Sequence, residues 1–391
     1  MRLTTKLVLP VFTNGLRTVV ISIGNLLIAW LVIRQTSAEE WGTFVPYLVG
    51  MGLVTHVLGW GNKEFLLRQF SLDEKNIASA FYSSLGARAS LLVVVSLVGS
   101  FLLPIGIPVT WLLGWLIAFF LYQSYDAWIT YQKAFGLAAL VDALGLGLIV
   151  GALFLQPQMS FPAPFYLIAL YAMSYTLRWL LLFFLIGLPK LPEKGSLKIF
   201  DLAYLSTAAP LLLVGLVGLL SSKMDLYVVS YTLDAKSSGE YQILTGGLNF
   251  IRATAGFIVY AFITDVYKMS KANISLQLKR LTALGVGISF AGVVALSLLF
   301  RYGLDLAFDF EIYLVAVFYC LPTFVIILCV IYLYRIKQEA IVIRYGIINA
   351  GVNFTLSLVL LPMLGILGGL LAGFISLSIT AVLYLLAFNR K

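Results

Sequence analysis

Long, uninterrupted apolar runs are the feature of this sequence that most limits its fold. Of the 391 residues, 61% are hydrophobic and 11% are charged, and the hydrophobic residues gather into runs instead of amphipathic patterns. A run of about 20 apolar residues crosses a bilayer as an α-helix. A closed β-barrel is the only other structure that satisfies the backbone in lipid, and its strands are about half as long. The sequence therefore predicts an all-α, polytopic membrane protein.

About twelve membrane spans can be placed along the chain. They are expected over residues 9–33, 41–61, 79–103, 109–133, 134–156, 163–187, 200–222, 238–264, 281–300, 311–335, 338–361 and 363–388. The first is too long for a cleaved signal peptide and carries Arg17. Asn62 to Ala78 mixes apolar and charged residues and is expected to lie at the membrane interface.

Basic residues are unevenly distributed among the predicted connections. With a cytoplasmic amino terminus, roughly 17 of the 26 lysines and arginines fall on the cytoplasmic side. The opposite side holds Arg34, Lys223, Lys236 and Arg301. This bias predicts a multi-pass membrane protein with both termini in the cytoplasm. It also accounts for most of the net charge of +9 without nucleic acid as a partner.

A weak internal repeat divides the chain near its middle. Pro10 opens an apolar run that is followed by a polar stretch and Gly42, and Pro210 opens a similar run that leads to Gly239. The spacing from proline to glycine is about 30 residues in both copies. We expect two pseudo-symmetric six-helix bundles, residues 1–190 and 191–391, joined by the segment 188–200.

Two predicted spans carry a polar stripe. At 100° per residue, the polar residues of span one fall within roughly 140° and those of span eight within roughly 80°. The stripes consist of Asn14, Arg17, Thr18, Ser22 and Asn25, and of Gln242, Thr245, Asn249, Arg252, Gly256 and Tyr260. Stripes of this length are expected to line a bundle interior or a water-filled cavity.

Five arginines and two aspartates lie inside predicted spans, where each charge costs about 2.5–3.5 kcal/mol at mid-span. Asp126 and Asp142 either neutralise Arg88 and Arg178 or line the cavity with them. The first arrangement leaves three arginines without an acidic partner in the membrane: Arg17, Arg252 and Arg344. Such a cavity favours an anionic ligand, and the planar fork of arginine suits phosphate. The position of Arg344 near the cytoplasmic edge also allows it to snorkel.

No enzymatic machinery is recognisable. The sequence contains no nucleophile–base pair, no metal-ligand cluster and no phosphate-binding glycine loop, and its single histidine, His56, is expected to pack. Cys320 and Cys329 share one predicted span on opposite faces and cannot bridge each other. We expect a protein that is not an enzyme and uses neither metal nor cofactor.

Several motifs resemble a known family when they are taken in order. They are Glu40-Trp41-Gly42-Thr43-Phe44, Gly61, Arg68, Asp225, Gly239-Glu240-Tyr241, Asn349, Asn353 and Leu361-Pro362-Met363-Leu364-Gly365-Ile366-Leu367-Gly368-Gly369. Together they resemble the Wzx-type O-antigen flippases of the multidrug/oligosaccharidyl-lipid/polysaccharide (MOP) exporter superfamily. The sequence is somewhat short for that family, and we expect it to lack the extra pair of helices that some relatives have.

The resemblance implies two six-helix bundles around a cavity lined largely by spans one, two, seven and eight. It implies that an undecaprenyl-pyrophosphate-linked oligosaccharide is moved from the cytoplasmic to the outer leaflet. The partners would be this substrate, membrane lipids and other polysaccharide-assembly proteins. We expect Arg17, Arg252 and Arg344 to bind the pyrophosphate or acidic sugars, and Asn14, Asn25, Gln242 and Asn249 to bind the sugar.

Two alternatives remain. A multidrug exporter of the same superfamily, coupled to a cation, would require unpaired carboxylates in its cavity, whereas the excess charge in these spans is positive. A membrane-embedded glycan polymerase or ligase typically has a substantial extramembrane loop or a His/Asp cluster, and neither is evident in this sequence.

Overall fold

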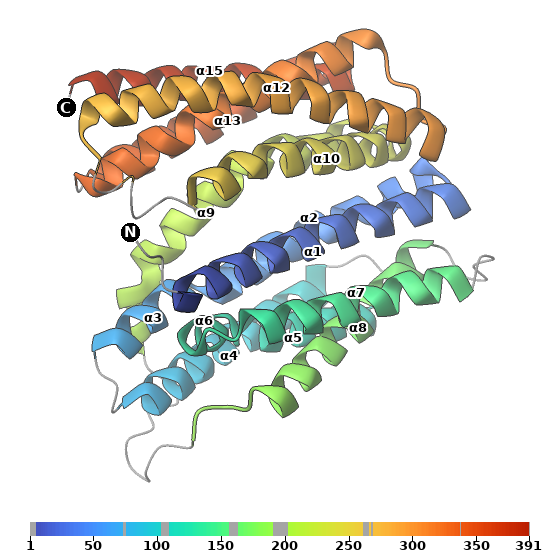
Figure 1. The fold of residues 1–391 in the computed structure, drawn as a ribbon. Helices are drawn as coiled ribbons and strands as arrows, with labels where there is room; N and C mark the ends of the chain where they lie inside the picture. Colours follow the sequence, from blue (N-terminus) through green and yellow to red (C-terminus); the bar gives the residue numbers. More distant parts are fainter. Residues whose placement is uncertain are drawn as a thin grey trace. The chain divides into compact units, whose positions relative to one another are not determined.

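The computed structural model describes residues 5–72, 76–102, 109–155, 163–190, 202–260, 266, 269–336 and 338–390, and this part contains helices and no strand. The helices (Figure 1) are α1 (Thr5–Gln35), α2 (Ala38–Gly59), α3 (Asn62–Leu72), α4 (Ile77–Leu102), α5 (Val109–Gln123), α6 (Asp126–Gln132), α7 (Phe135–Leu155), α8 (Ala163–Leu185), α9 (Leu202–Thr232), α10 (Ala235–Tyr260), α12 (Lys271–Gly303), α13 (Phe310–Arg335), α14 (Glu339–Leu364) and α15 (Ile366–Arg390). Ten stretches within the described residues are long and apolar enough to cross a membrane. The predicted all-α, multi-span architecture is confirmed. The ten candidate spans of the described residues are approximately consistent with the predicted number of about twelve.

Three predicted elements differ in detail. The span expected over 109–133 breaks at Ser124 and Tyr125, which separate α5 from α6. The polar stretch expected as a connection after residue 222 is helical as far as Thr232 and completes α9. Residues 62–72 of the expected interfacial segment form the helix α3. The expected linker between the halves falls largely outside the described residues.

The chain divides into two compact units that exchange short pieces of sequence. Unit 1 comprises Met1–Leu31 and Tyr47–Leu216, and unit 2 comprises Val32–Pro46 and Val217–Lys391. The corner between α1 and α2 therefore belongs with the C-terminal helices, and the first half of α9 belongs with the N-terminal ones. The pair of six-helix bundles stays a prediction.

Within unit 1, α8 packs against both α5 and α7, and α3 packs against α4 and α6 (Figure 1). Aromatic side chains fill the space between these helices. Tyr122 and Tyr125 join the core between α5, α7 and α8, and Phe70 and Phe81 join a second core beneath α3. This packing fixes the faces of α7 and α8 that carry their charged residues, and the face of α5 that carries Tyr122.

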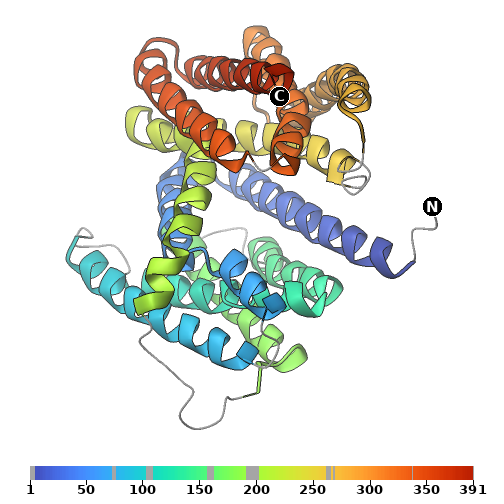
Figure 2. The ribbon, with the colours of Figure 1, turned by 90° about the vertical axis from the view of Figure 1, so that its left-hand side faces the viewer.

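Within unit 2, α13 packs against α10, α12 and α15. Figure 2 shows α14 and α15, in orange-red and red, as a hairpin. The turn between them contains Gly365, whose φ of 57° lies in the left-handed region that glycine adopts without a steric penalty. The helices α10 and α13 bring together the polar groups of this unit.

Candidate functional site

A buried charge cluster forms inside unit 1 around Arg17 of α1. Its Nε lies 2.7 Å from Oδ2 of Asp142 on α7, and its Nη2 lies 3.2 Å from Oδ1 of Asp126. Nη2 also donates to the hydroxyl of Tyr122, 2.8 Å away on α5. Because α6 starts at Asp126, the break after α5 places this carboxylate at a helix amino terminus, where the helix dipole favours negative charge.

Arg178 of α8 completes the cluster from the other side of Asp142. Its Nη1 lies 3.7 Å from Oδ1 of Asp142, and the guanidinium carbon lies 4.8 Å from the ring centre of Tyr175. The side chain runs across Gly145 of α7, where an added Cβ would collide with it. The cluster therefore holds two arginines and two aspartates, and its formal charge is zero.

This cluster corrects the predicted pairing. The expectation that Arg17 lacks an acidic partner is wrong, because Arg17 binds both aspartates. The pairing of Arg178 with Asp142 is found. Helical periodicity shows which residues share a face of one helix, but it does not show which neighbouring helix that face meets.

Arg88 of α4 forms no ion pair within the described part of the chain, although it is only 1% exposed. Its Nη2 donates to the hydroxyl of Ser124, 3.1 Å away, and the guanidinium lies over the ring of Phe120. Its Nε and Nη1 have no hydrogen-bond partner among the described residues. The expected pairing of Arg88 with an aspartate is wrong, since Arg17 and Arg178 bind these carboxylates.

In unit 2, Arg252 of α10 is surrounded by neutral oxygen atoms. Its Nε donates to Oγ1 of Thr323 at 3.0 Å, and its Nη1 donates to Oδ1 of Asn249 and to the hydroxyl of Tyr319, both at 2.9 Å. The guanidinium also lies 4.9 Å from the ring centre of Tyr319. Among the described residues Arg252 forms no ion pair and its Nη2 forms no hydrogen bond, so neutral oxygens hold the guanidinium in place. The buried carboxylate of Asp225 on α9 interacts with Arg252 electrostatically but does not pair with it.

A buried carboxylate on α9 was missed from the sequence. Asp225 was expected in a polar connection, but it lies inside α9, is 3% exposed and accepts a hydrogen bond from the hydroxyl of Tyr241 on α10. Two buried asparagines of α14 also bond to hydroxyl side chains: Asn349 to Thr380 at 3.2 Å and Asn353 to Ser357 at 3.1 Å. All three residues belong to the motifs that carry the family resemblance, but their spacing gives no periodic signal that predicts their burial or their partners.

The two glycines of the internal repeat occupy the same place in their helices. Gly42 is the fifth residue of α2 and Gly239 is the fifth residue of α10. The contacts are reciprocal, because a Cβ on Gly42 would overlap the carbonyl oxygen of Ala235, and one on Gly239 would overlap that of Ala38. The two helix starts, both within unit 2, therefore touch through backbone, a contact that the sequence repeat alone does not predict.

The remaining predicted contacts are spread over two environments. Gln242 is half-buried, and its Oε1 accepts a hydrogen bond from Nε1 of Trp41 at 2.8 Å. Asn14, Asn25, Asn249 and Arg344 are exposed. The structure thus brings Asn249 and Arg252 together directly, while Arg17 belongs to the neutral cluster of unit 1. No group of three or more His, Cys, Asp or Glu residues suited to a metal ion occurs in the described part.

Comparisons with known proteins give matches only among solved structures. No protein-family profile matches the chain, and no curated protein sequence matches it. A structure of the lipid II flippase MurJ in an inward closed conformation superposes with a TM-score of 0.72 at 14% identity, covering 96% of this chain and 87% of that one. The multidrug transporter DinF-BH, of the MATE type, superposes with a TM-score of 0.63 at 15% identity, covering 100% and 96%.

A third match is a MOP-superfamily transporter from Pyrococcus furiosus, with a TM-score of 0.59, 14% identity and coverage of 97% and 94%. The description of that structure states that its binding pocket has reverse polarity, which suggests a different function. These neighbours are membrane transporters and not enzymes. At such low identities the likeness establishes the fold alone: this chain shares the fold of these membrane transporters, and ten of its helical stretches are long and apolar enough to cross a membrane.

Proposed function

We propose that the protein is a flippase for an undecaprenyl-pyrophosphate-linked oligosaccharide, and that Arg252 binds the anionic group of this substrate. The observation that carries the proposal is the guanidinium of Arg252, which neutral oxygens orient and no carboxylate of the described residues pairs with directly. The flippase MurJ, named for lipid II, shares the fold. A lipid-linked pyrophosphate is an anion of the kind that such a fixed cation would attract.

The main barrier to moving a pyrophosphate across lipid is the loss of its hydration. A fixed guanidinium replaces part of that hydration, and its planar fork offers paired donors to phosphate oxygens. Thr323 and Tyr319 hold the Nε and Nη1 side of the fork, so Nη2 is left to face a ligand. Asn249, bonded to Arg252 and exposed, is placed to bind a sugar hydroxyl beside the anion.

The other residues that are predicted to bind substrate have different roles in this proposal. Arg17 is neutralised by two carboxylates, so we assign it to holding the helices of unit 1 together, with direct substrate binding as a secondary role. Asn14, Asn25, Gln242 and Arg344 stay candidate contacts for the glycan. Location in the inner membrane, cytoplasmic termini and assistance from polysaccharide-assembly proteins belong to the same proposal.

The experiment is transport by purified protein in liposomes that contain an undecaprenyl-pyrophosphate disaccharide with a fluorescent label. We expect Arg252→Ala to lower the flipping rate at least tenfold and Arg252→Lys to recover part of it, since lysine keeps the charge but loses the fork. Lys236→Ala, on a side chain that is 68% exposed, is the control and should leave the rate unchanged. A wild-type rate in Arg252→Ala would refute the anion site.

The second candidate function is a cation-coupled multidrug exporter. The buried carboxylate of Asp225, bonded to a phenol and to no arginine in the described part, is the observation that favours it, together with the likeness to DinF-BH. Uptake of a cationic dye into the same liposomes under a proton or sodium gradient separates the two. Dye transport that fails in Asp225→Asn and persists in Arg252→Ala would replace the flippase assignment.

A further inference from the structure

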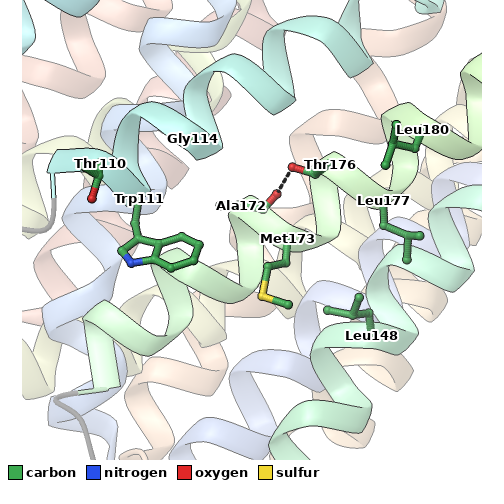
Figure 3. Close-up of a pocket in the computed structure, with 9 residues that line it drawn as sticks. All are labelled: Thr110, Trp111, Gly114, Leu148, Ala172, Met173, Thr176, Leu177 and Leu180. Carbon is green, nitrogen blue, oxygen red and sulfur yellow. Dashed lines mark hydrogen bonds between the residues drawn. The ribbon is translucent and has the colours of Figure 1, made fainter.

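An apolar groove opens on unit 1 between α5, α7 and α8. Its volume is about 650 Å³, which lies in the ~300–1,000 Å³ range of small-molecule pockets. Figure 3 shows the lining: Trp111 and Gly114 come from α5, Leu148 from α7, and Ala172 and Thr176 from α8. The groove is separate from the charge cluster around Asp142 and belongs entirely to unit 1.

Small residues create the space for the groove. Gly114 faces Ala172, and a Cβ added to Gly114 would lie 4.0 Å from the Cβ of Ala172, at ordinary contact distance. Large apolar side chains stand at the sides of this gap, with Trp111 47% exposed and Met173 49% exposed. The gap is therefore open to the surroundings and is not filled by the protein itself.

The lining is mostly apolar and suits a hydrocarbon chain. Among the described residues none that lines the groove is charged, and its polar groups are the hydroxyls of Thr110 and Thr176 and the indole N–H of Trp111. The hydroxyl of Thr176 donates to the carbonyl of Ala172 at 2.8 Å, drawn as a dashed line in Figure 3, so this donor is already used within α8. Both α7 and α8 contain stretches suited to cross a membrane, which places Leu148 and Thr176 at the depth of the lipid tails.

We propose that this groove binds one acyl chain of a membrane phospholipid. An unfilled apolar groove lacks dispersion contacts that a chain supplies along its length. Because the lining does not distinguish headgroups, occupancy follows concentration, and phospholipid is the most abundant source of chains around the protein. The inference stands on the groove alone and is independent of the proposed transport function.

The first test is native mass spectrometry of the purified protein after a wash with delipidating detergent. The wild type should keep one phospholipid, and Gly114→Leu, whose side chain enters the groove without a backbone clash, should keep at least tenfold less. The matched control is Gly287→Leu on α12, where an added Cβ meets nothing within 4 Å. Equal retention in all three proteins, or equal loss in both variants, would overturn the proposal.

The main measurement of the second test does not require the Gly114→Leu variant to fold. Met173 is replaced by a photo-crosslinking benzoylphenylalanine, and membranes are irradiated before purification. An adduct with the mass of a phospholipid is expected, and Gly114→Leu in the same chain should reduce it. An adduct with a polyprenyl lipid, or with no lipid at all, would show that phospholipid is not the occupant.

Discussion

Arg17 and Arg252 are both half-buried arginines on polar stripes of apolar helices, yet their surroundings differ in one decisive way. Arg17 lies within 3.2 Å of two carboxylates and shares one of them with Arg178. Arg252 has only hydroxyl, phenol and amide oxygens as partners in the described part. A neutralised arginine contributes to the architecture of its unit, whereas an oriented and uncompensated one retains its attraction for an anion.

The comparison separates stability from ligand binding. Breaking a buried ion pair leaves one charge unpaired in a low dielectric, which destabilises a protein by about 3–5 kcal/mol. Removing an arginine that binds neutral oxygens loses only a few hydrogen bonds. The two clusters should therefore respond differently: substitutions in the unit 1 cluster should mainly lower the free energy of unfolding, and substitution of Arg252 should mainly impair transport.

The largest effect is expected for Asp142→Asn. This carboxylate is fully buried and pairs with both Arg17 and Arg178, so its loss leaves two neighbouring cations with only Asp126, which pairs with Arg17. We expect the free energy of unfolding to fall by about 3–5 kcal/mol, measured by denaturation in detergent micelles. Asp126→Asn is the control, because that side chain is 26% exposed and makes one pairing contact. Similar stability of the two variants would contradict the shared role of Asp142.

A smaller effect is expected when the arginines themselves are replaced. Arg17→Ala should lower the free energy of unfolding by about 2–3 kcal/mol, less than the loss of Asp142 because Arg178 still pairs with that aspartate. Arg252→Ala should lower it by about 1 kcal/mol. A double-mutant cycle between Arg17 and Asp142 should give a coupling energy of about 1–3 kcal/mol. Zero coupling, or equal losses at the two arginines, would remove the distinction between the clusters.

The repeated helix starts provide a third test within unit 2. Gly42→Ala and Gly239→Ala each place a methyl group into a backbone carbonyl of the other helix, and overpacking of this kind costs about 1–3 kcal/mol. The overlap is deeper at Gly42, so Gly42→Ala should be the more damaging. Gly246→Ala on α10 is the matched control, since its Cβ would meet nothing within 4 Å. Because alanine has a greater helix propensity than glycine, Gly246→Ala should leave the free energy of unfolding unchanged or raise it.

The sequence predicts some of these features and not others, for physical reasons. The hydrophobic runs predict the fold because a chain in lipid has few ways to satisfy its backbone. The repeat predicts the matching places of Gly42 and Gly239 in their helices from the similar spacing of proline and glycine. The close backbone approach, which requires glycine at both positions, is visible only in the structure. The partners of Arg17 could not be predicted, because they lie more than 100 residues away and depend on which helices meet. Asp225 was assigned to a connection because its polar neighbours hid the continuation of α9.

The smallest effect compares the two helix caps, at Ser37 before α2 and Asp234 before α10. The side chain of Ser37 accepts from the backbone N–H of Glu40 at 3.1 Å, and Asp234 accepts from that of Ser237 at 2.7 Å. Replacing either capping residue by alanine should lower the free energy of unfolding by up to about 1 kcal/mol at neutral pH. The backbone N–H of Ser237 lowers the pKa of Asp234, so its contribution is complete above the unfolded-state pKa of about 3.9. The contribution disappears as the pH falls through the lower folded-state pKa. Denaturation at pH 7 and pH 3 measures this difference. The loss of unfolding free energy caused by Asp234→Ala should be smaller at pH 3, whereas the loss caused by Ser37→Ala should be the same at both. Equal losses at the two pH values for both variants would show that the charge of Asp234 contributes nothing.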